Sequence, residues 1–178
     1  MPLAPTLRIT LAVACLAANA FGQLWTDPKD SKLPPDFQVQ GEYAGKDLGA
    51  QVIALGKGRF HAVVYPGGLP GAGWDGENKT LLDGSLDGDK AAFAAAEGPK
   101  NYIARDAAKF SATRAFPPKG HKPYKGMISK GVFSLTSDTG VSFSLRRTIR
   151  KSPSLGAKPP ENAIVLFDGS KESMKNWQ

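Results

Sequence analysis

Residues 131–149 read GVFSLTSDTGVSFSLRRTI and contain the clearest structural pattern in the chain. From Val141 to Arg146, apolar residues alternate with polar ones, a two-residue period that predicts a β-strand with one buried and one wet face. Residues 131–136 form a second arm, and the turn sequence Ser-Asp-Thr-Gly joins the two. The stretch therefore predicts an antiparallel hairpin. Arg147 falls on the buried side of the alternation, which predicts a bulge or the end of the core there.

Strand-like segments also precede this hairpin. Five of them are separated by turns or loops: residues 37–43, 51–55, 59–65, 79–86 and 90–96. Gly56-Lys57-Gly58 and Asp87-Gly88 lie between consecutive arms, where glycine supplies the positive backbone angles of tight hairpins. The alanines of residues 91–96 leave a short helix open, but the adjacent Asp-Gly turn favours a strand. Residues 101–116 have mixed periodicity, with a strand preferred.

The spacing of these segments defines the fold class. With 20 glycines and 14 prolines in 178 residues, the chain favours short strands and turns over long helices. About seven or eight short strands at this spacing predict an all-β domain over residues 36–150, an antiparallel barrel or sandwich. Residues 66–76 and 115–125 are expected to be loops.

The first twenty residues have the composition of a secretory signal peptide. Arg8 precedes an apolar run, and Ala18-Asn19-Ala20 offers the small-x-small pattern that signal peptidase recognises. The apolar run is too short to span a bilayer, and a buried N-terminal helix is the alternative. We therefore predict cleavage near Ala20, export to the periplasm or the extracellular space, no transmembrane span, and a flexible lead-in at residues 21–35.

Cys15, the single cysteine, lies inside this segment. Cleavage before Cys15 with acylation of its thiol would make the protein a lipoprotein, which is a minor alternative because the apolar run ahead of it is very short. If the chain is cleaved after Ala20, the mature protein has no cysteine, and its core must stabilise it without disulfides.

The charge of the chain bears on its partners. There are 23 Lys and Arg residues against 16 Asp and Glu residues, a net charge of +7. Such a charge is typical of proteins that bind nucleic acid or an anionic membrane, but export argues against nucleic acid and the basic residues are scattered along the chain. A weak affinity for an acidic cell-envelope polymer is one interpretation, and a solvated basic surface is the other.

Other motifs do not meet the conditions of the sites they resemble. Residues 71–76 match GxGxxG, but a hairpin follows where a pyrophosphate site needs a helix. Residues 83–89 look like the start of a calcium loop, yet the twelfth position is Ala94 instead of a bidentate Glu; turn chemistry is the main interpretation and a non-standard calcium site the alternative. His61 and His121 are far apart, and no HExxH motif or cysteine pair is present, so we predict no metal site and no cofactor.

Trp74 is the main candidate for ligand contact. It lies in a glycine-flanked loop with little local packing, where an exposed indole can stack on a sugar ring. Tyr65 and His61 share one face of the adjacent strand candidate and would complete a carbohydrate-binding site. Alternatively, Trp74 folds back to close the open end of a barrel, and His61 is a partly exposed strand residue.

Residues 162–178 follow a proline-rich linker at residues 151–161. Here Leu166-Phe167-Asp168-Gly169, followed by Trp177, resembles the opening of the 3-keto-disaccharide (3-keto-glycoside) hydrolase-like domain of secreted bacterial proteins. The resemblance implies that residues 162–178 are the truncated start of a second, concanavalin-like β-sandwich domain. Their apolar run is then expected to lie unpaired or to borrow a strand edge from the preceding domain.

The same resemblance implies a carbohydrate-active parent protein. The pocket of that family would be built from strands beyond this stretch, so no catalytic residue carries over to the chain. We expect an exported, ancillary β domain, non-catalytic in itself and glycan-binding near Trp74. A cell-envelope interaction or structural module, and a barrel that binds a small ligand in its mouth, are the alternatives.

Overall fold

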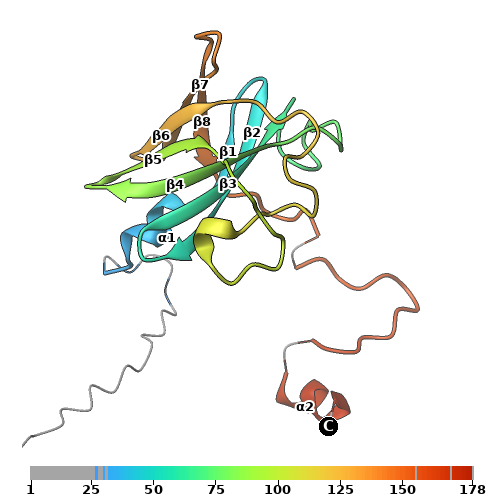
Figure 1. Ribbon diagram of the computed structural model, residues 1–178. Coiled ribbons are helices and arrows are strands. Elements are labelled where there is room, and N and C mark those ends of the chain that lie inside the picture. Colours follow the sequence, from blue (N-terminus) through green and yellow to red (C-terminus); the bar gives the residue numbers. More distant parts are fainter. Residues whose placement is uncertain (1–26, 28–29, 31, 155, 169, 178) are drawn as a thin grey trace, which may run out of the picture. The chain divides into compact units, whose positions relative to one another are not determined.

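The computed structural model of the protein describes residues 27, 30, 32–154, 156–168 and 170–177. Eight strands form a closed antiparallel barrel in which neighbours in sequence are neighbours in the sheet (Figure 1). The predicted all-β class is confirmed, and the architecture is the barrel and not the sandwich. The elements in chain order are α1 (Pro35–Val39), β1 (Gly41–Ala44), β2 (Leu48–Gly56), β3 (Arg59–Pro66), β4 (Thr80–Asp87), β5 (Lys90–Ala95), the 3-10 helix η1 (Ala107–Lys109), β6 (Lys125–Ser129), β7 (Val132–Thr136), β8 (Ser142–Thr148), α2 (Lys171–Met174) and the 3-10 helix η2 (Lys175–Trp177).

The barrel closes because β1 pairs on both sides. Tyr43 of β1 lies opposite Ala50 of β2 and opposite Arg147 of β8, both in antiparallel register. Each of the eight strands therefore has two hydrogen-bonded neighbours, and closure of this kind removes the exposed strand edges of an open sheet.

Aromatic rings fill the interior of the barrel. Phe93 lies between Phe60 and Phe133, with ring centroids 6.1 and 4.9 Å away, and Tyr43 meets Phe133 edge-on at 5.7 Å. These four side chains are at most 4% exposed. An eight-stranded barrel has an interior just wide enough for side chains to fill, and this one is packed in that way. The buried core consists of Val39, Tyr43, Leu48, Ala50, Val52, Phe60, Ala62, Val64, Leu82, Ala91, Phe93, Tyr124, Ile128, Phe133, Leu135 and Leu145.

Two glycines within strands make room for these side chains. A Cβ atom at Gly84 would overlap the ring of Phe93, its cross-strand partner in β5. A Cβ atom at Gly126 would lie 2.6 Å from the side chain of Leu135 and 3.0 Å from that of Phe133. Glycine normally weakens a strand, so these positions mark places where a side chain approaches the backbone closely.

The helix α1 corrects one prediction. Residues 37–43 were expected to form a strand, but Pro35–Val39 is helical and β1 starts at Gly41. The reason is local, because proline is favoured in the first turn of a helix. Val39 is buried in the core, and its carbonyl accepts a 2.6 Å hydrogen bond from the Tyr43 hydroxyl.

Arg147 lies next to α1. Its place in the β8 register is regular, so the predicted bulge is absent there and the alternative, the end of the core, describes the position. Its Nη2 donates to the carbonyls of Phe37 and Gln40, at 3.1 and 3.0 Å, and its guanidinium lies 5.9 Å from the Phe37 ring centroid.

Residues 97–124 lie between β5 and β6 and form a long connection that contacts the outer face of β3 and β4. We call this connection the covering loop. The strand predicted within residues 101–116 is wrong, because this segment contains only η1 and an isolated bridge between Asn101 and Phe110. Side chains of the loop bond to its own backbone instead: Asp106 accepts from the Ala108 N–H at 3.0 Å. Such local bonds compete with a strand ladder.

The tight turns follow the sequence predictions. Gly56, Lys57 and Gly58 all have positive φ, at 80°, 55° and 68°. The alanine-rich segment is strand β5 and not a helix. The predicted loops at residues 66–76 and 115–125 are present apart from their boundary residues, which belong to β3 and β6.

The described residues before α1 and after β8 form turns and short helices. Asp27, Asp30 and Leu33 form successive turns through backbone hydrogen bonds of 3.2 Å. The predicted signal peptide and Cys15 lie outside the described residues. At the other end, the apolar run at residues 163–167 is not a strand, and Nε1 of Trp177 donates to the Leu166 carbonyl at 3.1 Å.

Candidate functional site

The outer face of β3 and β4 carries a partly buried polar cluster. His61 of β3 lies opposite Asp83 of β4, and its Nδ1 is 2.9 Å from Oδ1 of Asp83. Lys100 of the covering loop donates from Nζ to Oδ2 of Asp83 and, at 2.7 Å, to the carbonyl of Ala108. The side chains of His61 and Lys100 are 0% and 2% exposed, but that of Asp83 is 39% exposed. A buried imidazole and a buried ammonium therefore hold one accessible carboxylate.

His61 is a neutral imidazole in this arrangement. Its Nε2 accepts the backbone N–H of Ala112 at 3.3 Å, so the ring proton is on Nδ1, which donates to Asp83. The ring of Phe110 packs edge-on against the imidazole, with centroids 5.5 Å apart. His61 is thus fully buried under the covering loop and not partly exposed, and both ring nitrogens are already bonded.

Asp83 is held in its ionised form. Burial raises the pKa of this carboxyl, but the hydrogen bonds from His61 and Lys100 and the charge of Lys100 outweigh burial, so the net pKa is lowered. Both oxygens of the carboxylate accept one donor each, which fixes the orientation of the group.

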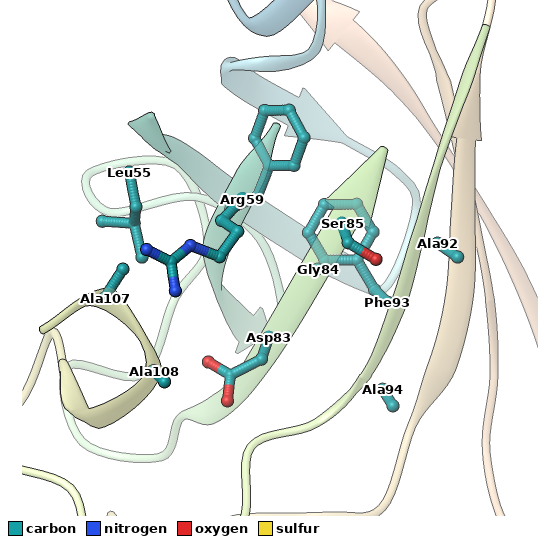
Figure 2. Close-up of a pocket in the computed structure, with 11 residues that line it drawn as sticks. Leu55, Arg59, Asp83, Gly84, Ser85, Ala92, Phe93, Ala94, Ala107 and Ala108 are labelled. Atoms are coloured by element: carbon teal, nitrogen blue, oxygen red, sulfur yellow. The ribbon is translucent and has the colours of Figure 1, made fainter. Parts of the chain in front are cut away.

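An open groove of about 460 Å³ lies beside this cluster. Figure 2 shows the carboxylate of Asp83 and the guanidinium of Arg59 directed toward η1, with Ala92 and Ala94 of β5 on the other side. Most of the exposed lining is apolar, because four alanines contribute to it. The lining residues are Leu55, Arg59, Phe60, Asp83, Gly84, Ser85, Ala92, Phe93, Ala94, Ala107 and Ala108.

Two polar side chains of the groove have no bonding partner within the described part of the chain. The guanidinium of Arg59 and the hydroxyl of Ser85 have no hydrogen bond or ion pair there, and both residues are exposed. Arg59 lies directly opposite Ser85 in the β3–β4 register, and Asp83 is two residues from Ser85 on the same outer face. Arg59 and Asp83 are therefore diagonal cross-strand neighbours, whose backbones are about 7–8 Å apart.

Tyr65 and Trp74 are brought together, as the sequence predicted. Their rings meet edge-on with centroids 5.0 Å apart, and Nζ of Lys79 lies 4.9 Å from the Trp74 ring centroid. Nε1 of Trp74 donates to the Asn78 carbonyl at 2.8 Å, and the Tyr65 hydroxyl donates to Gln51 at 2.7 Å. Tyr65 is 6% exposed and Trp74 is half-buried, so much of this pair packs against the barrel.

This pair sits in a cluster separate from the barrel interior. Val63, Tyr65, Leu81 and Ala96 are buried together, and Trp74 and residues of the covering loop pack on them. Trp74 thus packs against the outer face of β3. Tyr65 and Lys79 also line a smaller pocket of about 220 Å³.

His121 fastens the covering loop to the barrel at a second point. Its Nδ1 accepts the backbone N–H of Leu81 at 3.2 Å, and the ring of Phe116 lies 5.9 Å away. Burial lowers the pKa of His121, and a hydrogen bond with the Ala96 backbone offsets only part of this effect. Burial thus favours the neutral form of His121.

Sequence reasoning did not select Arg59, Ser85 or Lys100. Asp83 was considered only as the start of a calcium-like loop; instead its carboxylate bonds to His61 and Lys100. Among the described residues, no group of three or more His, Cys, Asp or Glu side chains is placed to hold a metal ion. The same part of the chain contains no helix long and apolar enough to cross a membrane.

The chain is thus a closed eight-stranded antiparallel barrel with a lateral groove beside a fixed carboxylate. Comparisons with protein-family models, with curated proteins and with solved structures find no match. What the groove can bind must therefore follow from its own geometry and charge.

Proposed function

We propose that the barrel is a non-catalytic carbohydrate-binding module of an exported protein, and that the groove beside Asp83 is its sugar site. The observation that carries this proposal is the carboxylate of Asp83, which is accessible, ionised and fixed by the buried side chains of His61 and Lys100. A group fixed in advance loses little conformational freedom when a ligand binds.

The groove has the chemistry that a sugar requires. A carboxylate offers about four lone-pair sites, and His61 and Lys100 use one on each oxygen of Asp83, which leaves acceptor capacity for two sugar hydroxyls. The methyl groups of Ala92, Ala94, Ala107 and Ala108 supply apolar surface for the C–H face of the ring.

Binding is favoured over hydrolysis by the state of the carboxylate. Glycosidases commonly use a pair of carboxyl groups, one of which has a raised pKa and donates a proton to the leaving oxygen. The groove is lined by one carboxyl group, that of Asp83, and its pKa is lowered. An ionised carboxylate accepts hydrogen bonds from a ligand but does not donate a proton to it.

Two sequence features support the wider setting. The predicted signal peptide is the basis for export, and the resemblance of residues 162–178 to a hydrolase-like domain is the basis for a carbohydrate-active parent protein. Under this proposal the barrel holds a glycan while a neighbouring domain acts on it.

The proposal is tested by calorimetry, which measures glycan binding to the wild-type protein, to one groove variant and to one control variant. Ala92→Phe places a ring in the groove from an exposed strand position and should abolish binding. Ser134→Phe is the matched control, since Ser134 is exposed on β7 and pairs with Met127, the partner of Ala92, outside the groove.

Trp74→Ala separates the groove from the site predicted near Tyr65 and Trp74. We expect this variant to bind glycans as the wild type does. Loss of binding with Trp74→Ala but not with Ala92→Phe would move the sugar site to the Trp74 cluster, and no binding of any glycan to the wild type would refute the proposal.

A cell-envelope interaction module is the second candidate, because one described segment exposes a set of large apolar side chains. Ile164, Leu166, Phe167, Met174 and Trp177 are between 55% and 86% exposed. Exposed apolar residues grouped in this way are typical of protein contact sites. Sedimentation with cell-envelope fractions that persists in Ala92→Phe and is lost when these five residues are replaced would favour this candidate.

A further inference from the structure

We infer that the groove selects sugars that carry a carboxylate, and that Arg59 is the residue that recognises it. This inference rests on the proposed function and adds the ligand class. Arg59 lines the groove, is exposed and has no ion-pair partner in the described part of the chain. A planar guanidinium matches a carboxylate with two parallel hydrogen bonds, which is a geometry that lysine cannot provide.

The charges at the groove favour the binding of an anion. The carboxylate of Asp83 is already paired with the ammonium of Lys100, and His61 is neutral. Arg59, Lys100 and Asp83 together carry two positive charges and one negative charge, so this group of side chains has a net positive charge before a ligand binds. A ligand with one negative charge would bring the site to neutrality, which favours its association.

The spacing of the two charged groups gives the ligand an orientation. Arg59 and Asp83 are diagonal neighbours across β3 and β4, with backbones about 7–8 Å apart. One pyranose ring with its substituents spans such a gap. Its carboxylate would meet Arg59, two of its hydroxyls would donate to Asp83, and the Ser85 hydroxyl, opposite Arg59, would bond to a group in between.

The experiment compares two ligands that differ in the charge of their three carboxyl groups. Trigalacturonate and its fully methyl-esterified form share the same rings and hydroxyls, but only the first carries carboxylates. Calorimetry at low salt should give tighter binding of the acid by about tenfold or more, and that advantage should shrink as salt is added, since Arg59 is exposed and its ion pairs are screened.

Arg59→Gln tests the residue itself. The variant should lose the preference for the acid, because its affinity for the acid falls far more than its affinity for the methyl ester, and Arg59→Lys should recover only part of the preference. Arg146→Gln is the matched control. Arg146 is exposed on the outer face of β8, so this substitution removes the same charge outside the groove.

The outcomes separate this inference from the proposed function. Equal affinity for acid and ester, blocked by Ala92→Phe, would overturn the inference and leave the proposed sugar site in place. Equal losses in Arg59→Gln and Arg146→Gln would also overturn it, since the preference would then come from the overall charge. Binding of neither ligand would refute both.

Discussion

Both histidines bond the barrel to the covering loop, His61 from β3 and His121 from the loop itself. His61 accepts the N–H of Ala112, and His121 accepts the N–H of Leu81, so each imidazole bonds a backbone amide between the barrel and the covering loop. A protonated imidazole has two donors and no acceptor. Each of these backbone bonds therefore exists only while its imidazole is neutral.

His121 makes the stability of the fold depend on pH. Its pKa in the folded protein is below the ordinary value of 6.5, so the unfolded chain binds a proton more readily than the folded one. The contribution of His121 is complete above pH 6.5 and is lost progressively as the pH falls from 6.5 toward the lowered pKa. We expect the melting temperature to fall over this range, measured by circular dichroism between pH 8 and pH 5.

His121→Asn isolates this contribution. The amide oxygen of asparagine can accept the Leu81 N–H but does not titrate in this range, so the variant should have a flatter pH profile than the wild type. Parallel profiles for the two proteins would show that the acid sensitivity has another origin.

At the scale of elements, the covering loop is held by contacts of very different burial. Lys100 reaches Asp83 with a side chain that is 2% exposed, whereas Lys119 pairs with Glu77 through side chains that are 65% and 61% exposed. Buried charge-assisted hydrogen bonds contribute far more than exposed ion pairs, because solvent screens the latter. The attachment of the loop to the barrel should therefore depend strongly on Lys100 and only weakly on Lys119.

Lys100→Met tests this difference. Removal of the ammonium leaves Oδ2 of Asp83 and the Ala108 carbonyl without their donor, and we expect a loss of about 1–3 kcal/mol in the free energy of unfolding in urea. Trypsin cleavage after Arg105 and Arg114, both exposed in the loop, should become faster as the loop opens locally.

Lys119→Met is the control and should change stability by less than about 0.5 kcal/mol. Equal effects of the two substitutions, or no change in cleavage with Lys100→Met, would mean that the aromatic contacts of the loop hold it without the polar cluster.

The elements also show what sequence patterns can and cannot predict. The two-residue alternation that puts His61 and Tyr65 on one face of β3 puts Phe60, Ala62 and Val64 on the other, because the pleat of a strand is a local property, and the structure shows that this other face is the interior one. The position of the covering loop could not be predicted in this way, because its hydrogen bonds join residues far apart in the sequence, such as His61 and Ala112. One signal was available: Val63 and Tyr65 make β3 apolar on its outer face too, which is typical of a strand covered on both sides.

The groove was missed for a related reason. Arg59 lies on β3, whereas Asp83 and Ser85 lie on β4, and only the register of the two strands makes Arg59 their neighbour. Sequence alone could place each on an outer face, but η1, which forms the opposite wall, lies in the segment predicted as a strand.

At the scale of the whole molecule, closure of the barrel decides how it can associate. All eight strands have both neighbours, so the barrel offers no edge to residues 163–167, and the expectation that they borrow one is not met. Arg150, two residues after the end of β8, is the last described residue of this region that bonds to the barrel. Its guanidinium donates to both carboxylate oxygens of Glu42 at 2.6 Å and to the Pro70 carbonyl at 2.7 Å. The hydrogen bond from Arg150 is the largest of the causes that lower the pKa of Glu42.

Truncation separates the contribution of Arg150 to stability from that of the C-terminal segment. A protein that ends after Ser152 keeps Arg150, and its melting temperature should differ from that of the full chain by less than about 2 °C, because the hydrogen bonds found for the described residues 156–177 run to residues 154–177 and none runs to the barrel. Loss of the exposed Ile164, Leu166 and Trp177 should also reduce self-association in light scattering.

A protein that ends after Ile149 is the matched comparison, since it lacks Arg150 as well. Because it lacks the two bonds to Glu42, its melting temperature should fall below that of the protein that ends after Ser152, since a bidentate pair with one partly buried partner is stronger than an ordinary surface ion pair. A large fall already on truncation after Ser152 would show instead that the C-terminal segment packs on the barrel. In that case its apolar side chains would belong to the stability of this domain and would not be free to contact another.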